Sequence, residues 1–284
     1  MTPKPRKQRH TAWVRMLLGM LGVYVVGIML LVLTNNGNLF PTIVLIGSFM
    51  VPASYVAFFY ERRNLSQLSM PTTARGFAYG GILGVLAATV LERILVRGMT
   101  VPYAFVVGFI EEFVKILGIL VLARSLQRNR ELDGLILGAA AGMGFAALES
   151  MGYSFMAFLR SNGSLSASVG VTLGRALLSP LGHGTWTAIF AAVLFREAAD
   201  SRFRVNGKVI GAYLQVVVLH GLWDALGMII DPNSSMAGFE VLVGQLIVGA
   251  ASITLLVRRW RESVRALTAS EPALVVDQVS PPVA

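Results

Sequence analysis

The chain has 284 residues, of which 55% are hydrophobic and 14% charged, and its mean hydropathy is +0.68. Soluble globular proteins carry about 25% charged residues, so this composition excludes an ordinary soluble domain. The absence of cysteine excludes disulfides and thiolate metal ligands or nucleophiles, and the net charge of +9 lies mostly between apolar segments, which favours a membrane protein with no nucleic-acid partner.

Apolar runs of about 20 residues, the length that crosses the hydrocarbon core of a bilayer, recur along the chain. In chain order the predicted spans cover 13–33, 40–60, 76–96, 101–123, 133–159, 173–195, 209–230 and 239–257. The first follows MTPKPRKQRH directly, but it is longer than the core of a signal peptide and lacks a small-residue cleavage site, so we interpret it as a retained span. The sequence therefore predicts an all-α, polytopic transmembrane helix bundle of about eight spans.

Lysine and arginine are concentrated in every second connecting segment. They are Lys4, Arg6, Lys7 and Arg9 before the first span, Arg62, Arg63 and Arg75 in the second connection, Arg124, Arg128 and Arg130 in the fourth, Arg196, Arg202, Arg204 and Lys208 in the sixth, and Arg258, Arg259, Arg261 and Arg265 after the last span. Because cytoplasmic loops are enriched in Lys and Arg, we expect both termini in the cytoplasm and the chain in the inner (cytoplasmic) membrane of the cell.

The extramembrane segments are short, so the sequence predicts no soluble domain. We divide the chain into a basic cytoplasmic N-terminus at 1–12, a transmembrane bundle at 13–257 and a cytoplasmic tail at 258–284. The tail contains proline and has no apolar core, which predicts disorder. Within the fifth span, small residues and one carboxylate share a face at helical spacing: Gly138, Gly142, Phe145, Glu149 and Gly152.

Ionisable side chains lie deep inside four predicted spans. The fourth contains VVGFIEEFVKILGILVL, in which Lys115 is four residues from Glu111 and three from Glu112 and can reach either carboxylate. The others are Glu149 in the fifth span, His183 in the sixth, and His220 and Asp224 in the seventh. At 1.5 Å per residue, the four helices place their Glu or His about 15 Å from their outer ends, with Asp224 one turn shallower. This agreement in depth predicts a common site.

The residue types allow several functions. Imidazoles and carboxylates are ligands for a zinc-like cation, whose bound water a spare carboxylate could deprotonate. A metal-free glutamate could also activate water while a histidine polarises a carbonyl. The same groups could form a proton path in a proton- or cation-coupled transporter, or a structural ion-pair network. Glu92, near a span end beside Arg93, is interpreted as a group that pairs or reaches the interface.

The order of three short motifs narrows this choice. EEFVK at 111–115 has the pattern EExxK, FAALE at 145–149 has FxxxE, and HGLWD at 220–224 has HxxxD, with His183 in HGTWTA between the last two. This set resembles the PrsW family of intramembrane proteases, relatives of the Abi and CAAX-prenyl proteases, over residues from about 75 to 257. FxxxE, where prenyl proteases have FxxxH, argues against a prenylated substrate.

The resemblance implies a membrane-embedded endopeptidase that cleaves single-pass membrane proteins such as anti-sigma factors. It implies catalytic roles for Glu111, Glu112, Lys115, Glu149, His183, His220 and Asp224, and a divalent metal, zinc being preferred, held by Glu112, Glu149, His183 and His220. Glu112 is preferred over Glu111 as the water-activating base, Lys115 would restrain the pair, and Asp224 would orient His220. The wider superfamily also includes a noncatalytic scaffold subunit, which keeps an inactive scaffold as an alternative.

Overall fold

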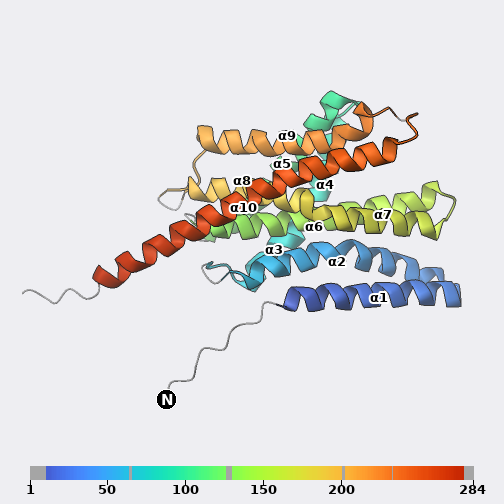
Figure 1. Ribbon diagram of the computed structural model, residues 1–284, viewed down its shortest axis with the longest axis horizontal. Coiled ribbons are helices and arrows are strands. Elements are labelled where there is room, and N and C mark those ends of the chain that lie inside the picture. The colour runs from blue at the N-terminus through green and yellow to red at the C-terminus, as the bar shows by residue number, and fades with distance from the viewer. Residues whose placement is uncertain (1–10, 64–65, 126–129, 200–201, 232, 278–284) are drawn as a thin grey trace, which may run out of the picture.

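Ten α-helices lie roughly side by side in the part of the chain that the structure describes (Figure 1). The structure, a computed structural model, describes residues 11–63, 66–125, 130–199, 202–231 and 233–277. The helices are α1 (Ala12–Thr34), α2 (Phe40–Glu61), α3 (Met70–Ala78), α4 (Val85–Leu95), α5 (Val101–Leu122), α6 (Glu131–Arg160), α7 (Leu165–Leu178), α8 (His183–Arg196), α9 (Gly207–Ile229) and α10 (Ala237–Asp277). In Figure 1, α1 and α9 form opposite edges, and α6 lies between them.

Seven helical stretches of the described chain are long and apolar enough to cross a membrane. They are 12–34, 37–61, 70–95, 131–160, 165–196, 207–229 and 237–269. The fourth predicted span, 101–123, is not among these seven; it corresponds to α5, which has 22 residues and carries Glu111, Glu112 and Lys115 near its middle. The prediction of an all-α polytopic bundle is confirmed.

Polar side chains at two connections show why the helices begin where they do. The Ser69 hydroxyl accepts a hydrogen bond from the Thr72 N–H, so α3 starts six residues before the predicted third span. A π-helical segment, Tyr79–Gly84, joins α3 to α4 without ending the helical stretch. The Asn206 side chain accepts hydrogen bonds from two backbone N–H groups in the first turn of α9.

The sixth predicted span differs most from its sequence-based expectation. A single helix was expected over 173–195, but α7 begins at Leu165, and a short 3-10 turn, Ser179–Leu181, separates it from α8. Pro180 has no N–H to continue the hydrogen bonding of α7. The Thr185 hydroxyl donates to the Pro180 carbonyl at 2.6 Å and lies 2.9 Å from the Tyr55 hydroxyl of α2. The break therefore makes His183 the first residue of α8.

The tail also differs from its prediction. Instead of disorder from residue 258, α10 continues to Asp277, while residues 278–284 lie outside the described residues, as do the basic residues at 1–10. Glu262 accounts for part of this helix, because it pairs with Arg258 four residues before it and with Arg259 three residues before it. The ring of Trp260 also packs edge-on against Phe59 of α2, 5.4 Å between centroids.

Small residues let α6 form the centre of the bundle, packed against α2, α3, α7 and α8. A Cβ atom added at Gly138 would lie 2.5 Å from the Thr187 carbonyl oxygen, and one at Gly142 would collide with the His183 carbonyl. Gly152 has no such neighbour within 4 Å. The predicted stripe is therefore a close-packing surface at its first two glycines, where it sets the position of α8.

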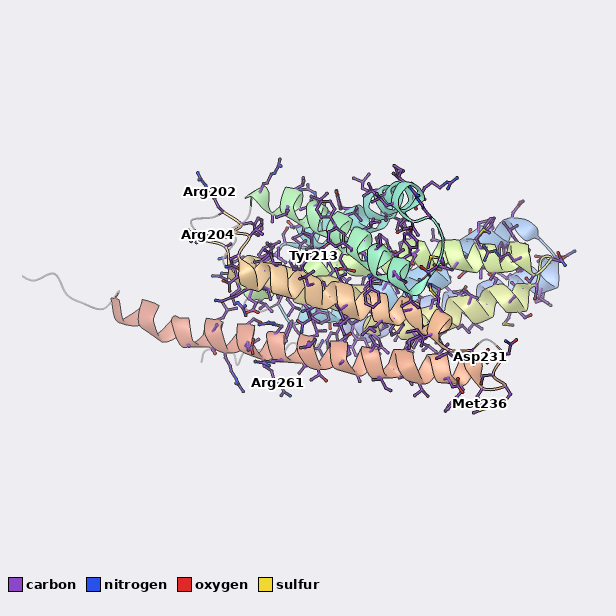
Figure 2. The ribbon with its side chains drawn as sticks, turned by 90° about the horizontal axis from the view of Figure 1, so that it is seen from above. Arg202, Arg204, Tyr213, Asp231, Met236 and Arg261 are labelled. Carbon is purple, nitrogen blue, oxygen red and sulfur yellow. The ribbon has the colours of Figure 1, made fainter. Side chains whose placement is uncertain are left out.

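Charged residues differ between the two ends of the bundle. Figure 2 shows Arg202 and Arg204 near one end, with Arg261 toward the same side, and Asp231 at the opposite end. This separation follows the alternation of basic connections along the sequence.

Candidate active site

Lys115 lies at the centre of the predicted cluster. Its Nζ is 3.2 Å from Glu111 Oε2, 2.8 Å from Glu112 Oε1 and 2.9 Å from His183 Nδ1. The side chain is fully buried, and its ammonium also lies 4.0 Å from the centroid of the Phe145 ring. A charge buried in this way requires close partners, and Lys115 has two carboxylates and one imidazole around it.

Glu112 belongs to a closed part of the cluster. Its Oε1 is bound to Lys115, and its Oε2 accepts a hydrogen bond from the Thr187 hydroxyl of α8 at 2.8 Å. No part of Glu112 is exposed. Glu111 has the same lysine as partner, but it is 5% exposed and lines a cavity. The two adjacent carboxylates thus have different surroundings.

The partners of His183 determine its tautomer. An ammonium group can donate hydrogen bonds but not accept them, so His183 Nδ1 must accept from Lys115. The proton of the neutral ring then resides on Nε2, which donates to Glu149 Oε2 at 2.9 Å. This tautomer is assigned from the partners. It leaves Nδ1 facing Glu111 Oε2, 3.7 Å away.

His220 is held in a layer of aromatic rings. Its imidazole stacks on Trp186, with centroids 4.6 Å apart and planes 27° apart, and the Trp186 N–H donates to Ser252 of α10. His220 Nε2 lies 3.4 Å from Asp224 Oδ2 and 3.7 Å from Glu111 Oε2. The predicted pairing of Asp224 with His220 is therefore present in the structure.

Arg175 of α7 was not predicted as part of the site. Its guanidinium donates to Glu149 Oε2 at 2.6 Å and to the Ser150 hydroxyl at 3.0 Å. The predicted span begins at 173, which leaves Arg175 at the edge of a connection rather than beside the site. The signal that could have found it is the uncharged stretch LSASVGVTLG before it, which extends the helix to Leu165. Thr187, the partner of Glu112, was missed as well.

A cavity of about 390 Å³ lies beside the cluster, between α4, α5, α6, α7, α8 and α9. Its charged and imidazole lining residues are Glu92, Glu111, Glu149, Arg175, His183 and Asp224. Glu112, Lys115 and His220 do not line it. Glu92, interpreted from the sequence as an interfacial group, is thus part of the cavity wall. All seven predicted site residues lie in or next to this cavity.

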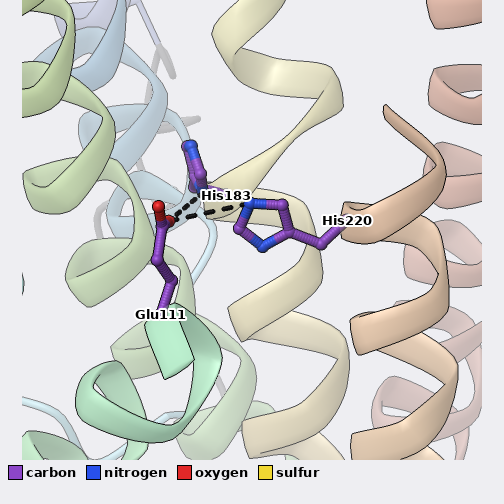
Figure 3. A group of neighbouring side chains, drawn as sticks. All are labelled: Glu111, His183 and His220. Carbon is purple, nitrogen blue, oxygen red and sulfur yellow. Dashed lines mark ion pairs between the residues drawn. The ribbon is translucent and has the colours of Figure 1, made fainter. Parts of the chain in front are cut away.

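One arrangement of donors suits a metal ion. Glu111, His183 and His220 each offer one ligand atom, and the three atoms lie within 4.8 Å of one another (Figure 3). Figure 3 shows Glu111 pointing toward both imidazoles. This group contains Glu111 in place of the predicted Glu112. Glu149 lies beyond it, on the far nitrogen of His183.

The fold and the site together define a polytopic membrane protein with a buried group of glutamate and histidine side chains. A family model described as PrsW family intramembrane metalloprotease matches residues 69–257. The chain is also 30% identical, over 176 residues, to "Protease PrsW" of Halalkalibacterium halodurans, an alignment that covers 60% of this chain and 77% of the relative. No solved structure matches significantly.

The chain belongs to the PrsW family of intramembrane metalloproteases and is therefore a membrane-embedded protease. The resemblance inferred from the three motifs is thus confirmed at the level of this family. The metal that the family description implies fits the chemistry of the site, since two imidazoles and a carboxylate form a common zinc ligand set. Lys115 already contacts Glu111 and His183, so a bound cation would compete with its ammonium group.

Proposed function

We propose that the chain is an endopeptidase that hydrolyses a peptide bond of a membrane protein inside the 390 Å³ cavity. The observation that carries this proposal is the position of Glu111, which lines the cavity and has imidazole nitrogens of His183 and His220 each 3.7 Å from its Oε2. A carboxylate at the cavity wall with two imidazoles beside it can activate water and stabilise the oxygen of an attacked carbonyl.

Glu111 is the water-activating base in this proposal, which reverses the sequence-based preference for Glu112. Glu112 cannot reach the cavity because Lys115 and Thr187 occupy its two oxygens. Its role is to hold Lys115, and Lys115 in turn orients Glu111. His220, which does not line the cavity, is proposed to orient Glu111 from the buried side, with Asp224 as its own partner.

Glu111, His183 and His220 would hold a divalent metal, zinc being preferred, in place of the set predicted from sequence. When bound, such a metal would polarise a carbonyl and lower the pKa of its water. Elemental analysis of purified protein tests this assignment. We expect metal to be lost in His220→Ala and kept in Glu112→Gln, whereas loss in Glu112→Gln with retention in His220→Ala would contradict it.

The proposed substrate is a single-pass membrane protein, anti-sigma-factor-like, that reaches the cavity within the inner membrane. Support comes from the family and from the position of the cavity among membrane-spanning helices. The arginine-rich end of the bundle is proposed to face the cytoplasm, with both termini on that side. The wider kinship with Abi and CAAX-prenyl proteases stays part of this proposal.

Two alternatives remain as outcomes of the test. Transporters often contain broken helices or paired inverted repeats, and the α7–α8 break is a feature of the first kind, but the family match favours proteolysis. A noncatalytic scaffold would still bind its partner proteins after Glu111 is substituted.

Cleavage by purified protein in liposomes, with single-pass membrane proteins as candidate substrates, tests the proposal. We expect Glu111→Gln to lower the cleavage rate about 100- to 10,000-fold. Glu240→Gln, which changes an exposed glutamate in the first turn of α10, should leave the rate unchanged. Equal cleavage by wild type and Glu111→Gln would refute the assignment, and pH-gradient-driven flux without cleavage would favour the transporter.

A further inference from the structure

We propose that Arg175 is a positioning residue that acts through Glu149 to fix the tautomer and orientation of His183. The inference deepens the proposed proteolytic function, on which its catalytic consequence rests. The structural part of the proposal concerns three side chains in contact, Arg175, Glu149 and His183. They come from α7, α6 and α8 and meet at the wall of the cavity.

Three contacts with α6 hold the Arg175 guanidinium. Its terminal nitrogen donates to Glu149 Oε2 at 2.6 Å, its Nε donates to Ser150 Oγ at 3.0 Å, and its carbon lies 4.2 Å from the centroid of the Tyr153 ring. Because the guanidinium is planar and its donors are fixed relative to one another, these contacts define its orientation. The Arg175 side chain is 31% exposed, so these contacts hold the guanidinium in place although water also reaches it.

The same oxygen of Glu149 accepts from Arg175 and from His183. His183 Nε2 lies 2.9 Å from Glu149 Oε2, and a carboxylate oxygen can accept two hydrogen bonds. Arg175 therefore fixes the acceptor that keeps the proton on Nε2. As a result the lone pair of Nδ1 is directed toward Lys115 and Glu111.

Space next to His183 would allow its ring to move if this restraint were lost. A second cavity, of about 90 Å³, is lined by Arg175, Ser150, His183 and Gln245. Shortening Arg175 would enlarge this space and free Glu149, so the His183 ring could turn away from Lys115, its other partner, and only then exchange tautomers. Arg175 has no hydrogen bond or ion pair with Glu111 or His220 among the described residues, so its effect must pass through Glu149 and His183.

Nuclear magnetic resonance of ¹⁵N-histidine-labelled protein in liposomes reads the tautomer directly. The chain has three histidines, His10, His183 and His220, so a His183→Asn variant assigns the relevant ring signals. In wild type we expect a protonated Nε2 and an unprotonated Nδ1. In Arg175→Met we expect a mixture of tautomers, with Arg175→Lys returning part of the wild-type signal and Arg160→Met, which changes an exposed arginine at the end of α6, leaving it unchanged.

Unchanged His183 signals in folded Arg175→Met would overturn the proposal. If Arg175→Met does not fold, Arg175→Gln, which retains a polar side chain beside Glu149, is measured in the same way and decides by the same criterion. The activity readout is separate: we expect Arg175→Met to lower kcat about 10-fold with little change in KM, the scale for partners of site histidines. If wild type cleaves nothing but the tautomer still depends on Arg175, the proteolytic assignment fails and the positioning role stands.

Discussion

The site has two layers, of which only one lines the cavity, although the adjacent residues Glu111 and Glu112 belong to different layers. The cavity-facing layer consists of Glu111, Glu149 and His183, and the closed layer of Glu112, Lys115 and Thr187. In the closed layer each carboxylate oxygen of Glu112 has a partner, whereas the cavity-facing layer presents Glu111 to space large enough for a substrate segment. Under the proposed function, the closed layer restrains charges and the cavity-facing layer carries out the chemistry.

The strongest test of this comparison is the pair Glu111→Gln and Glu112→Gln. We expect Glu111→Gln to lower kcat about 100- to 10,000-fold, the loss of a general base, with little change in thermal stability. Glu112→Gln should lower the unfolding temperature more than Glu111→Gln does. Cleavage rates and thermal unfolding in detergent measure the two effects. The comparison fails if Glu112→Gln stops cleavage at unchanged stability while Glu111→Gln remains active.

Removal of Lys115 should act mainly on stability. In Lys115→Met the buried Glu111 and Glu112 lose their shared cation, and breaking a buried ion pair from one side costs about 3–5 kcal/mol. Denaturant unfolding measures the loss. Lys208→Met, at a side chain that is 71% exposed, is the matched control. A Lys115→Met variant as stable as this control would show that the closed layer does not depend on its lysine.

We expect Gly142→Ala to displace His183, a member of the cavity-facing layer. The added Cβ would collide with the His183 carbonyl and displace the start of α8, and a shift of about 1 Å near a reacting group can cost up to about 100-fold in rate. Gly152→Ala has free space at the same helix and should cleave normally. Similar rates for the two variants would mean that α8 adjusts without moving His183.

The smallest expected effect belongs to Thr187→Val. Valine has nearly the same shape but cannot donate to Glu112 Oε2, so a destabilisation of about 1 kcal/mol is expected, with cleavage largely retained. Denaturant midpoints and initial rates check this. A large loss of rate with unchanged stability would instead place Thr187 in the chemistry.

Hydropathy alone predicted most of the bundle because lipid requires long apolar helices. The contacts of Lys115 with Glu111 and Glu112, and of His220 with Asp224, could also be predicted, since residues three or four apart share a helix face. Features that depend on contacts between helices could not be predicted in this way. The α7–α8 break needs Thr185 and Tyr55 to satisfy its polar groups, and an apolar count does not detect such partners.

The choice between Glu111 and Glu112 could not be made from sequence for a related reason. Adjacent residues on a helix point about 100° apart, so which one meets a cavity depends on how α8 and α9 pack around α5. Arg175 was missed because its contacts with Glu149 and Ser150 join two helices that the sequence does not pair. The helical continuation at 258–277 likewise depends on contacts such as that of Trp260 with Phe59.

The hydrogen bond between Tyr55 and Thr185 links α2 to α8, the helix that begins with His183. The family model begins at residue 69, so α1 and α2 stand outside the matched region, yet Tyr55 of α2 contacts the residue that completes the break before His183. A shortened chain of residues 69–257 would retain every site residue and still lose a support for the histidine. At least one helix outside the matched region, α2, therefore contributes to the position of His183.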